Sequence, residues 1–313
     1  SGLYEVVISL RNSAFDRGLL RSHKAARPVV SVGNISCGGT GKTPFVAWLW
    51  EECRKARIRA VVLSRGYAGN KVGNDEADEL RALGIPVYCN PNRAAEASRR
   101  SEEADLFILD DGFQHRQLHR DLDIVLVDAT RPFASDRLLP SGLLREPPSS
   151  LSRAQVVVLT RSNLASDSEQ QMAQLYALAP RSLVLQSFTV AEEVLEPVSR
   201  RREAPSVLSG AQVCAMSGIG NPQQFEAVIR STGAQLLEHF AFPDHHPYTE
   251  ADVRAVVDRA NSLGAQMILT TGKDYPKCRG FDHAGKLYIL STRHHTPLSG
   301  SLLEKVFALT GIE

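Results

Sequence analysis

A glycine-rich segment between a valine-rich stretch and a helix-forming stretch constrains the fold of this chain most. Residues 30–43 read Val-Ser-Val-Gly-Asn-Ile-Ser-Cys-Gly-Gly-Thr-Gly-Lys-Thr. The apolar run at 29–32 predicts a buried strand, and residues 44–53 predict the helix that follows the loop. Glycines placed between a strand and a helix N-terminus let backbone amides point at an anion. The segment therefore predicts a phosphate-binding loop.

The loop supplies one contiguous set of candidate nucleotide ligands. In a P-loop, the lysine reaches the β and γ phosphates and the next hydroxyl binds Mg²⁺, roles that would fall here to Lys42 and Thr43. The strict pattern has glycine at the position of Ser36 in this chain. The candidate nucleotide-binding residues are Ser36, Cys37, Gly38, Gly39, Thr40, Gly41, Lys42 and Thr43.

Two adjacent carboxylates end another predicted strand. Asp110 and Asp111 follow the apolar run at 106–109, and open α/β sheets bind ligands at the carboxyl ends of their strands. In a P-loop protein, a carboxylate at such a position orients Mg²⁺ or its waters. We therefore expect Asp110, Asp111 and Thr43 to bind the metal, and Asp110, Asp111 and Lys42 to act in catalysis. The sequence does not say which aspartate contacts the ion. Arginines that could clamp phosphate are Arg116, Arg120 and Arg145.

Strand and helix patterns alternate along the chain. Short apolar runs at 59–63, 86–89, 106–109, 122–127 and 156–159 are separated by helical or polar stretches, which predicts a P-loop NTPase-like α/β fold with a mostly parallel, doubly wound sheet. A second alternating unit has predicted strands at 213–217, 267–270 and 287–290 and a helix at 223–231. We therefore predict a nucleotide-binding domain over 1–205 and a smaller α/β domain over 206–313.

Composition excludes several classes of function. The formal net charge of +1 gives no basic field for nucleic acid. The 5 cysteines form no C-x-x-C pair, which argues against a disulfide framework or a zinc site and suits a reducing compartment. His115 and His119 have the spacing of a zinc pair but lack the adjacent glutamate of H-E-x-x-H.

The N-terminal stretch has amphipathic character. Apolar residues recur at helical spacing from Leu3 to Phe15, with Arg11, Arg17 and Arg21 beside or after them. Such a helix lies on an anionic membrane or docks on the core of its own domain, and the pattern alone favours docking. No run approaches the ~20 apolar residues that span a bilayer, and no segment resembles a signal peptide.

Six segments in order carry a family resemblance. They are residues 31–44, Ser-Arg-Gly-Tyr at 64–67, residues 110–121 beginning Asp-Asp-Gly-Phe-Gln-His, residues 139–147, Phe-Pro-Asp-His-His-Pro-Tyr at 242–248 and Thr-Gly-Lys-Asp at 271–274. The chain resembles the tetraacyldisaccharide 4'-kinases, the lipid A 4'-kinases of bacterial envelope synthesis, over nearly its whole length. Members of that family also have Ser at position 36 of the loop and an apolar, membrane-associating N-terminal segment, which shifts our expectation for Leu3 to Phe15 toward membrane contact.

The resemblance implies transfer of the ATP γ-phosphate, with Mg²⁺, to the 4'-hydroxyl of an acylated glucosamine disaccharide lipid. It implies peripheral contact with the inner membrane on its cytoplasmic side. It also implies a general base in a Gly-Asp-Glu motif, oriented by the first histidine of Phe-Pro-Asp-His, and these residues correspond here to Asp75 and His245. The chain reads Gly-Asn-Asp-Glu at 73–76, so Asp75 and Glu76 both remain candidates for the base.

Two other functions fit a P-loop. A nucleotide-switch or partitioning ATPase would need a lysine near Cys37 or an [NT]-K-x-D motif, whereas here Lys273 is followed directly by Asp274. A kinase for another small molecule or sugar fits the same scaffold. The two kinase readings differ in whether the substrate is acylated.

Overall fold

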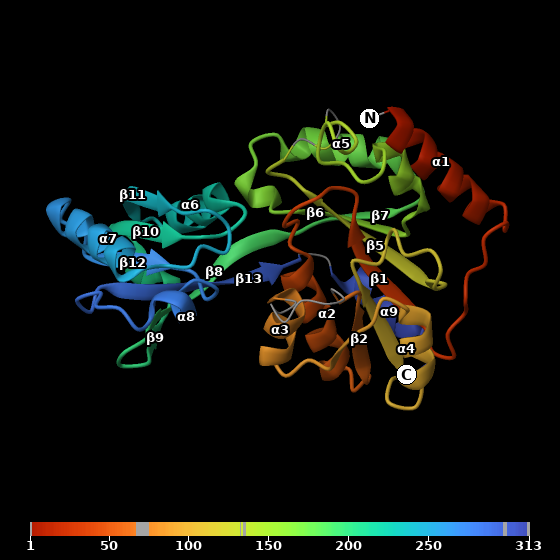
Figure 1. Cartoon of the computed structure of the whole chain (residues 1–313), viewed down its shortest axis with the longest axis horizontal. Coiled ribbons are helices and arrows are strands. Elements are labelled where there is room, and N and C mark those ends of the chain that lie inside the picture. Colours follow the sequence, from red (N-terminus) through yellow and green to blue (C-terminus); the bar gives the residue numbers. More distant parts are fainter. Residues whose placement is uncertain (1, 67–74, 132, 134–135, 297–298, 312–313) are drawn as a thin grey trace. The chain divides into compact units, whose positions relative to one another are not determined.

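The structure divides the chain into two units (Figure 1). This computed structural model describes residues 2–66, 75–131, 133, 136–296 and 299–311. One unit comprises Ser1–Phe188 and Thr296–Glu313, and the other comprises Thr189–His295. This division differs from the expected single boundary near residue 205. Strand β8 (Phe188–Glu196) already joins the second sheet, and helix α9 (Gly300–Ala308) returns to the first unit, where Leu302 and Val306 are buried in its core.

Seven strands form the sheet of the first unit, in the order β3-β2-β4-β1-β5-β6-β7, and each neighbouring pair is parallel. The strands are β1 (Val29–Asn34), β2 (Ala60–Ser64), β3 (Val87–Cys89), β4 (Leu106–Asp110), β5 (Leu122–Asp128), β6 (Val156–Thr160) and β7 (Leu183–Gln186). Because β1 lies between β4 and β5, the glycine-rich loop and the paired aspartates leave the same edge of the sheet. The predicted parallel, doubly wound sheet is confirmed.

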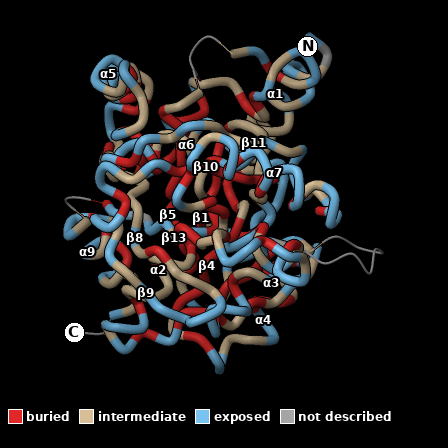
Figure 2. Tube along the Cα trace, turned by 90° about the vertical axis from the view of Figure 1, so that its left-hand side faces the viewer, coloured by how far each residue is buried: buried red, intermediate tan, exposed pale blue. Residues whose placement is uncertain are grey.

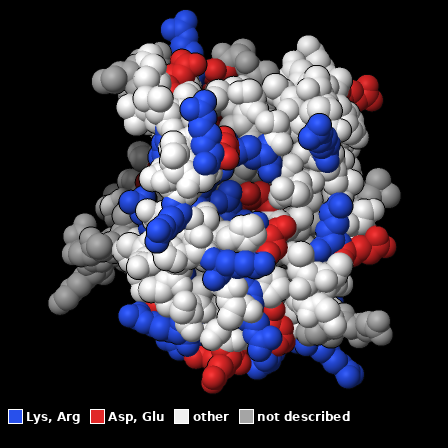
Figure 3. Space-filling model, turned by 90° about the vertical axis from the view of Figure 1, so that its right-hand side faces the viewer, with Lys and Arg blue, Asp and Glu red and all other residues white. Residues whose placement is uncertain are grey.

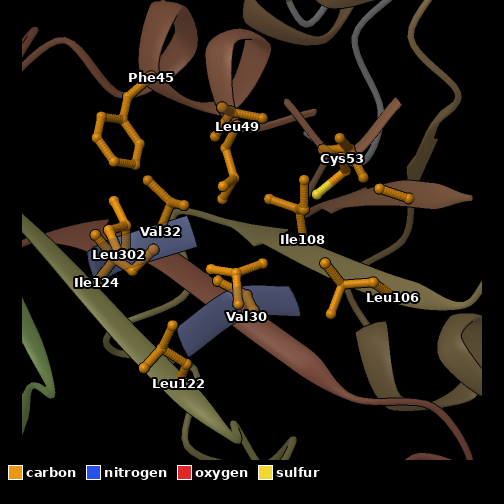
Figure 4. Close-up of a cluster of buried hydrophobic side chains, with 14 of the residues drawn as sticks. Val30, Val32, Phe45, Leu49, Cys53, Leu106, Ile108, Leu122, Ile124 and Leu302 are labelled. Carbon is orange, nitrogen blue, oxygen red and sulfur yellow. The ribbon is translucent and has the colours of Figure 1, made fainter. Parts of the chain in front are cut away.

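Both faces of this sheet are covered by packed apolar side chains. Val30 and Val32 of β1 face Phe45 and Leu49 of helix α2 in one core cluster, which Figure 4 shows from the side of the sheet. Val29 of the same strand belongs to a cluster on the opposite face, because successive side chains of a strand alternate. The helices of this unit are α1 (Gly2–Asp16), α2 (Lys42–Lys55), α3 (Asp75–Ala82), α4 (Arg93–Arg99), α5 (Ser168–Leu178) and α9, with 3-10 turns at Pro148–Arg153 and Ser162–Leu164.

The second unit has its own sheet, in the order β11-β10-β12-β13-β8-β9. Its elements are β8, β9 (Arg201–Glu203), β10 (Gln212–Ser217), β11 (Gln235–Ala241), β12 (Met267–Thr270), β13 (Leu287–His295), α6 (Pro222–Ser231), α7 (Glu250–Ser262), α8 (Tyr275–Cys278) and a 3-10 turn at Pro205–Leu208. Val253 and Val256 of α7 pack on Met216 and Ile268 of the sheet. Figure 2 shows the buried strands in red and the exposed outer sides of the helices in pale blue.

Helix α1 is attached to the first unit by polar contacts. Tyr4 donates to the carbonyl of Arg145 at 3.0 Å, Arg11 to the carbonyl of Gln114 at 2.8 Å, and Asn12 to the Glu146 carboxylate at 2.7 Å. Tyr4 also packs against the core of this unit, whereas three other apolar side chains of the helix stay exposed. Val6, Val7 and Leu10 are 54%, 53% and 65% exposed.

The sequence favoured docking of this helix through its apolar stripe, and these three side chains do not dock in that way. Phe15 also differs from the expectation that it faces outward with them, because the guanidinium groups of Arg11 and Arg116 lie 5.2 Å and 5.1 Å from the centre of its ring. The side chain of Leu3 lies outside the described residues. Among the described helices, none has the length and apolarity needed to cross a membrane.

Candidate active site

The glycine-rich loop leads directly into α2, which begins at Lys42, two residues before the predicted start. Gly41 precedes the helix with φ of 86° and Gly38 has φ of 95°, a left-handed conformation that glycine adopts without strain. A side chain at Gly38 would also place its Cβ 2.6 Å from a guanidinium nitrogen of Arg131. The backbone conformation therefore favours glycine at Gly38, whereas the end of the flexible Arg131 side chain could move aside.

Residues 143–145 hold the first half of the loop through backbone hydrogen bonds. The Cys37 amide donates to the carbonyl of Leu143 at 2.7 Å, and the Arg145 amide donates to the carbonyl of Ile35 at 2.7 Å. Thr40 is fixed as well, because its side chain accepts from Asn34 at 2.9 Å. The Cys37 amide is thus used within the protein.

The remaining glycine amides of the loop stay available to an anion. Within the described residues, the amides of Gly38, Gly39 and Gly41 donate to no other backbone carbonyl. These amides and the N-terminus of α2 retain the anion-binding capacity that the sequence predicted.

Lys42, Asp111 and Arg145 form one charged cluster at the base of the loop. Lys42 is 7% exposed, and its Nζ lies 3.6 Å from Asp111 Oδ1. A guanidinium nitrogen of Arg145 contacts both Asp111 oxygens at 2.9 Å and 2.8 Å. Burial opposes ionisation of Asp111, but Lys42 and Arg145 outweigh it and hold the pKa of this carboxyl below its usual range. Asp111 is therefore an anion that fixes two cations beside the loop.

Asp110 has a different environment from its neighbour. It is buried at the end of β4, where Ser64 donates to its Oδ2 at 3.2 Å. Burial and the nearby charge of Glu76 raise the pKa of Asp110 to about 6, although Lys42 acts in the opposite direction. No ion pair to Asp110 occurs in the described part of the chain. Asp110 is thus a buried carboxylate whose ionised form lacks a directly paired cation.

The backbone of the two aspartates is held by Arg93. This buried guanidinium donates to the carbonyls of Asp110 and Asp111 at 3.0 Å and 3.2 Å. Asp111 has φ of 50°, a left-handed conformation that aspartate adopts more readily than most residues and that occurs at functional sites. Sequence reasoning missed Arg93 and Ser64, although Ser64 begins the Ser-Arg-Gly-Tyr segment that carried the resemblance.

The oxygen groups near the loop suit Mg²⁺ in their chemistry. Thr43 is buried in the first turn of α2, next to Lys42, and Val32, just before the loop, pairs in register with Asp110. Carboxylate and hydroxyl oxygens are the hard ligands that Mg²⁺ takes, completed by phosphate and water. No group of three or more His, Cys, Asp or Glu side chains that could hold a metal ion occurs among the described residues. The assignment of Thr43, Asp110 and Asp111 to Mg²⁺ therefore stays a prediction.

The predicted base lies at the N-terminus of α3, which begins at Asp75. The side chain of Asp75 lies outside the described residues, as do residues 67–74. Its neighbour Glu76 is close enough to raise the pKa of Asp110. The N-terminus of α3 therefore lies near the end of β4, and the choice between Asp75 and Glu76 remains open.

His245 belongs to the second unit. It is exposed in a turn with φ of 60°, and its amide donates to the carbonyl of Gly218 at 3.0 Å. His246 is fixed differently, because it bonds to Asp252 at 3.1 Å and stacks on the ring of Phe242 at 4.7 Å. Since Asp75 and His245 lie in different units, their pairing stays a prediction.

Two of the three arginines proposed as phosphate clamps pair with other aspartates. Arg116 contacts Asp16 at 2.6 Å, and Arg120 contacts the buried Asp123 at 2.8 Å. Arg145 does lie beside the loop, where its side chain pairs with Asp111. The sequence singled out Lys42, Asp111 and Arg145 separately but did not predict that they contact one another, because Arg145 comes from a segment without regular structure.

Comparisons with a family model, with relatives and with a solved structure all indicate the same family. The model of the LpxK family, described as tetraacyldisaccharide-1-P 4'-kinase, matches residues 1–308. The tetraacyldisaccharide 4'-kinase of Halothermothrix orenii is 33% identical over 92% of this chain and 85% of its own length. That of Syntrophus aciditrophicus is 36% identical over 87% and 80%. The crystal structure of LpxK from Aquifex aeolicus in complex with ATP is similar with a TM-score of 0.72 at 29% identity, and the match covers 99% of this chain and 97% of that one.

Proposed function

Because the chain belongs to the tetraacyldisaccharide-1-P 4'-kinase family, we propose that it transfers the γ-phosphate of ATP to the 4'-hydroxyl of a tetraacyldisaccharide 1-phosphate. The observation that carries this proposal is the buried Lys42 beside Asp111 at the glycine-rich loop, in a chain that matches the family from residue 1 to residue 308. The same loop without the family match would support only a nucleotide-binding protein.

The residues of the loop bind and orient the triphosphate in this proposal. The amides of Gly38, Gly39 and Gly41 face the phosphates, and Lys42 neutralises charge that spreads over the transferred group in the transition state. Asp111 keeps Lys42 and Arg145 in place before the nucleotide binds. Since the cations are already positioned, little reorganisation is needed at the moment of reaction.

Mg²⁺, when bound, would supply positive charge that offsets the negative charge of the phosphates. Thr43, Asp110 and Asp111 are the residues that we assign to it. Asp110 is the stronger candidate for direct or water-mediated contact, because its carboxylate has no cation partner among the described residues, whereas Asp111 already contacts two. A divalent cation beside Asp110 would stabilise the ionised form that burial disfavours.

A carboxylate at the N-terminus of α3 accepts the proton of the 4'-hydroxyl in this scheme. The hydroxyl oxygen then forms a bond to the γ-phosphorus, the bond to the β-phosphate oxygen breaks, and ADP leaves. We assign the base to Asp75 and its orientation to His245. This assignment of His245 rests on the family resemblance of residues 242–248, and its Nε2 lies 3.8 Å from Asp244 Oδ1.

We further propose that α1 makes peripheral contact with the cytoplasmic face of the inner membrane. Its polar side is used for attachment to the first unit, and Val6, Val7 and Leu10 remain exposed. An apolar face that is turned away from the protein would be buried in the acyl boundary of a bilayer. This orientation would bring the loop of the kinase close to an acylated substrate.

The direct test of the activity is transfer of labelled γ-phosphate to a tetraacyldisaccharide 1-phosphate in mixed micelles. We expect Mg²⁺-dependent label on the lipid and none on water-soluble sugars. Label on a soluble sugar with none on the lipid would indicate a small-molecule kinase instead. Hydrolysis of ATP without any labelled acceptor would indicate a nucleotide-switch ATPase.

Vesicle sedimentation tests the membrane contact. We expect Leu10→Glu to reduce retention on vesicles by roughly tenfold, because an exposed leucine contributes about 1.5 kcal/mol or more when it is buried. Leu83→Glu is the matched control, since Leu83 is 62% exposed at the end of α3. Equal retention of the wild type and both variants would contradict insertion of α1.

A further inference from the structure

A hollow of about 580 Å³ opens between the segment that follows α1 and the segment that follows the paired aspartates. Phe15, Leu20 and Arg21 line one side, and Arg116, His119 and Arg120 line the other. Figure 3 shows the face of the molecule that carries α1, where several Lys and Arg side chains lie close together. The hollow combines cations with apolar side chains and lies entirely within the first unit.

Two of its arginines are fixed before any ligand binds. Arg116 donates to the carbonyl of Asn12 at 3.0 Å and contacts Asp16 at 2.6 Å. Arg120 donates to both oxygens of Asp123, and both partners are about nine-tenths buried. These pairs hold the wall of the hollow rigid, and the aspartates offset part of its charge.

Since Arg116 and Arg120 are already paired with aspartates, Arg21 and His23 are the side chains of the hollow that can bind a ligand. Both line the hollow, both are exposed, and neither side chain makes a hydrogen bond or ion pair with any described residue. Arg17 and Lys24 are exposed on either side of them along the chain. The guanidinium of Arg21 and the imidazole of His23, which line the same hollow, are complementary to a phosphate group.

Apolar side chains at the rim distinguish a lipid from a free anion. Leu20 lines the hollow and is 43% exposed, and its neighbour Leu19 is 73% exposed. These leucines follow the helix that exposes Val6, Val7 and Leu10. A ligand with a phosphate group and attached acyl chains would contact both the cations and the leucines, whereas inorganic phosphate would leave the leucines in water.

We propose that this hollow binds the phosphate headgroup of an anionic phospholipid, with Arg21 as the principal cation and Leu20 against the first part of an acyl chain. The proposal deepens the membrane contact assigned to α1, because it gives the protein a defined lipid site in addition to a general attraction. Two signals, an apolar helix face and a cationic site, anchor a peripheral protein better than either one alone.

The test uses the full chain and a short-chain phosphatidylglycerol below its critical micelle concentration, with binding followed by calorimetry. We expect saturable binding to one site and about fivefold weaker binding by Arg21→Gln, as expected for one cation near an anionic lipid. Arg17→Gln is the matched control, because it removes the same charge four residues away but does not line the hollow. Equal weakening by both variants would show diffuse attraction and overturn the proposal.

Two further measurements separate the possible ligands. Leu20→Ser should weaken binding of the short-chain lipid and leave binding of inorganic phosphate unchanged. Inorganic phosphate that binds as tightly as the lipid would contradict a role for the rim. A tetraacyldisaccharide 1-phosphate that displaces the phospholipid competitively would assign the hollow to the kinase substrate and overturn the proposal in that way.

These outcomes do not depend on the proposed function. The lipid is monomeric in this experiment, so its binding requires neither insertion of α1 into a bilayer nor phosphate transfer. Loss of the soluble-lipid site with normal kinase activity would refute only the hollow. Normal binding of the soluble lipid with no transfer to the disaccharide would refute only the kinase.

Discussion

Lys42 is the residue whose charge connects the loop to the proposed chemistry. It is buried beside Asp111, and Arg145 also contacts that aspartate. We expect Lys42→Ala to lower the rate of phosphate transfer by ~10²–10³, because one preorganised electrostatic contact is lost in the transition state. Arg145 still neutralises Asp111, so the melting temperature should change little.

Lys55→Ala is the matched control for this experiment. It removes a lysine from the other end of α2, where Lys55 forms an exposed ion pair with Glu52. Initial rates at saturating ATP, together with thermal melting curves, decide the question. A Lys42→Ala protein that retains wild-type turnover would refute the assignment of the loop.

His115 makes the stability of the first unit depend on pH. Burial, together with the nearby guanidinium groups of Arg93 and Arg120, lowers the pKa of His115 to about 4. An imidazole in the unfolded chain has a pKa near 6.5, so the unfolded state binds more protons between about pH 4 and 6.5. The contribution of neutral His115 is complete above pH 6.5 and is lost as the pH falls toward 4.

We therefore expect the wild type to lose about 1–3 kcal/mol more unfolding free energy than His115→Gln between pH 7.5 and 4.5. Urea denaturation at the two pH values measures this difference. Comparing the variant with the wild type removes the effects of the other titrating groups. Parallel losses in the two proteins would show that His115 is protonated as easily in the folded state as in the unfolded one.

At the residue scale, the sequence singled out individual charged residues more readily than it predicted which other residues contact them. Lys42, Asp110 and Asp111 were singled out because each lies in a local pattern that has a chemical meaning, and their roles stay predictions. Arg145 was considered only as a phosphate clamp, and Arg93 was missed. Both contact the aspartates from segments that are 17 to 34 positions away along the chain, and no local pattern encodes such a contact.

Among the elements, apolar strands were the easiest to predict. The strands of the first sheet are continuous buried runs, which parallel sheets require because helices cover both faces. Helix α7 was missed although its N-terminus has a sequence signal. Thr249 accepts from the Asp252 amide, and the Asp252 carboxylate accepts from the Thr249 amide. This capping box has aspartate where the usual motif has glutamate or glutamine.

The capping box at α7 gives a prediction for this element. We expect Thr249→Ala to lower the unfolding free energy of the second unit by about 1 kcal/mol, because an orphan helix amide loses its acceptor. Ser299→Ala is the control, since Ser299 precedes α9 without a side-chain cap bond. Denaturant unfolding measures both variants. A Thr249→Ala protein as stable as the control would show that the cap contributes nothing to stability.

At the scale of the whole molecule, the sequence predicted two α/β units but placed one boundary where the structure has two. Helix α9 follows the last strand of the second sheet, yet Leu302 and Val306 are buried against the first sheet. An amphipathic helix carries its apolar stripe in its sequence, but the stripe does not specify which of two similar sheets it covers. Local sequence patterns therefore do not predict that the chain returns to the first unit.

The proposed base and its orienting histidine lie in different units, so their pairing is a property of the whole chain. If Asp75 accepts the proton of the 4'-hydroxyl and His245 orients it, Asp75→Ala and His245→Ala should each lower kcat by ~10²–10⁴ and leave ATP affinity nearly unchanged. The losses should be non-additive in the double variant, because a base and its orienting partner act as a unit. His246→Ala is the control for the histidine, since His246 is engaged by Asp252 within the second unit.

Single-turnover rates for the four proteins of this cycle, with ATP affinity measured separately, give the coupling between the two positions. A double variant whose loss in log kcat equals the sum of the single losses would show independent roles. Glu76→Ala decides which carboxylate is the base. A strong loss of kcat in Glu76→Ala with normal turnover in Asp75→Ala would assign the base to Glu76, the residue whose charge already acts on Asp110, and would refute the assignment to Asp75.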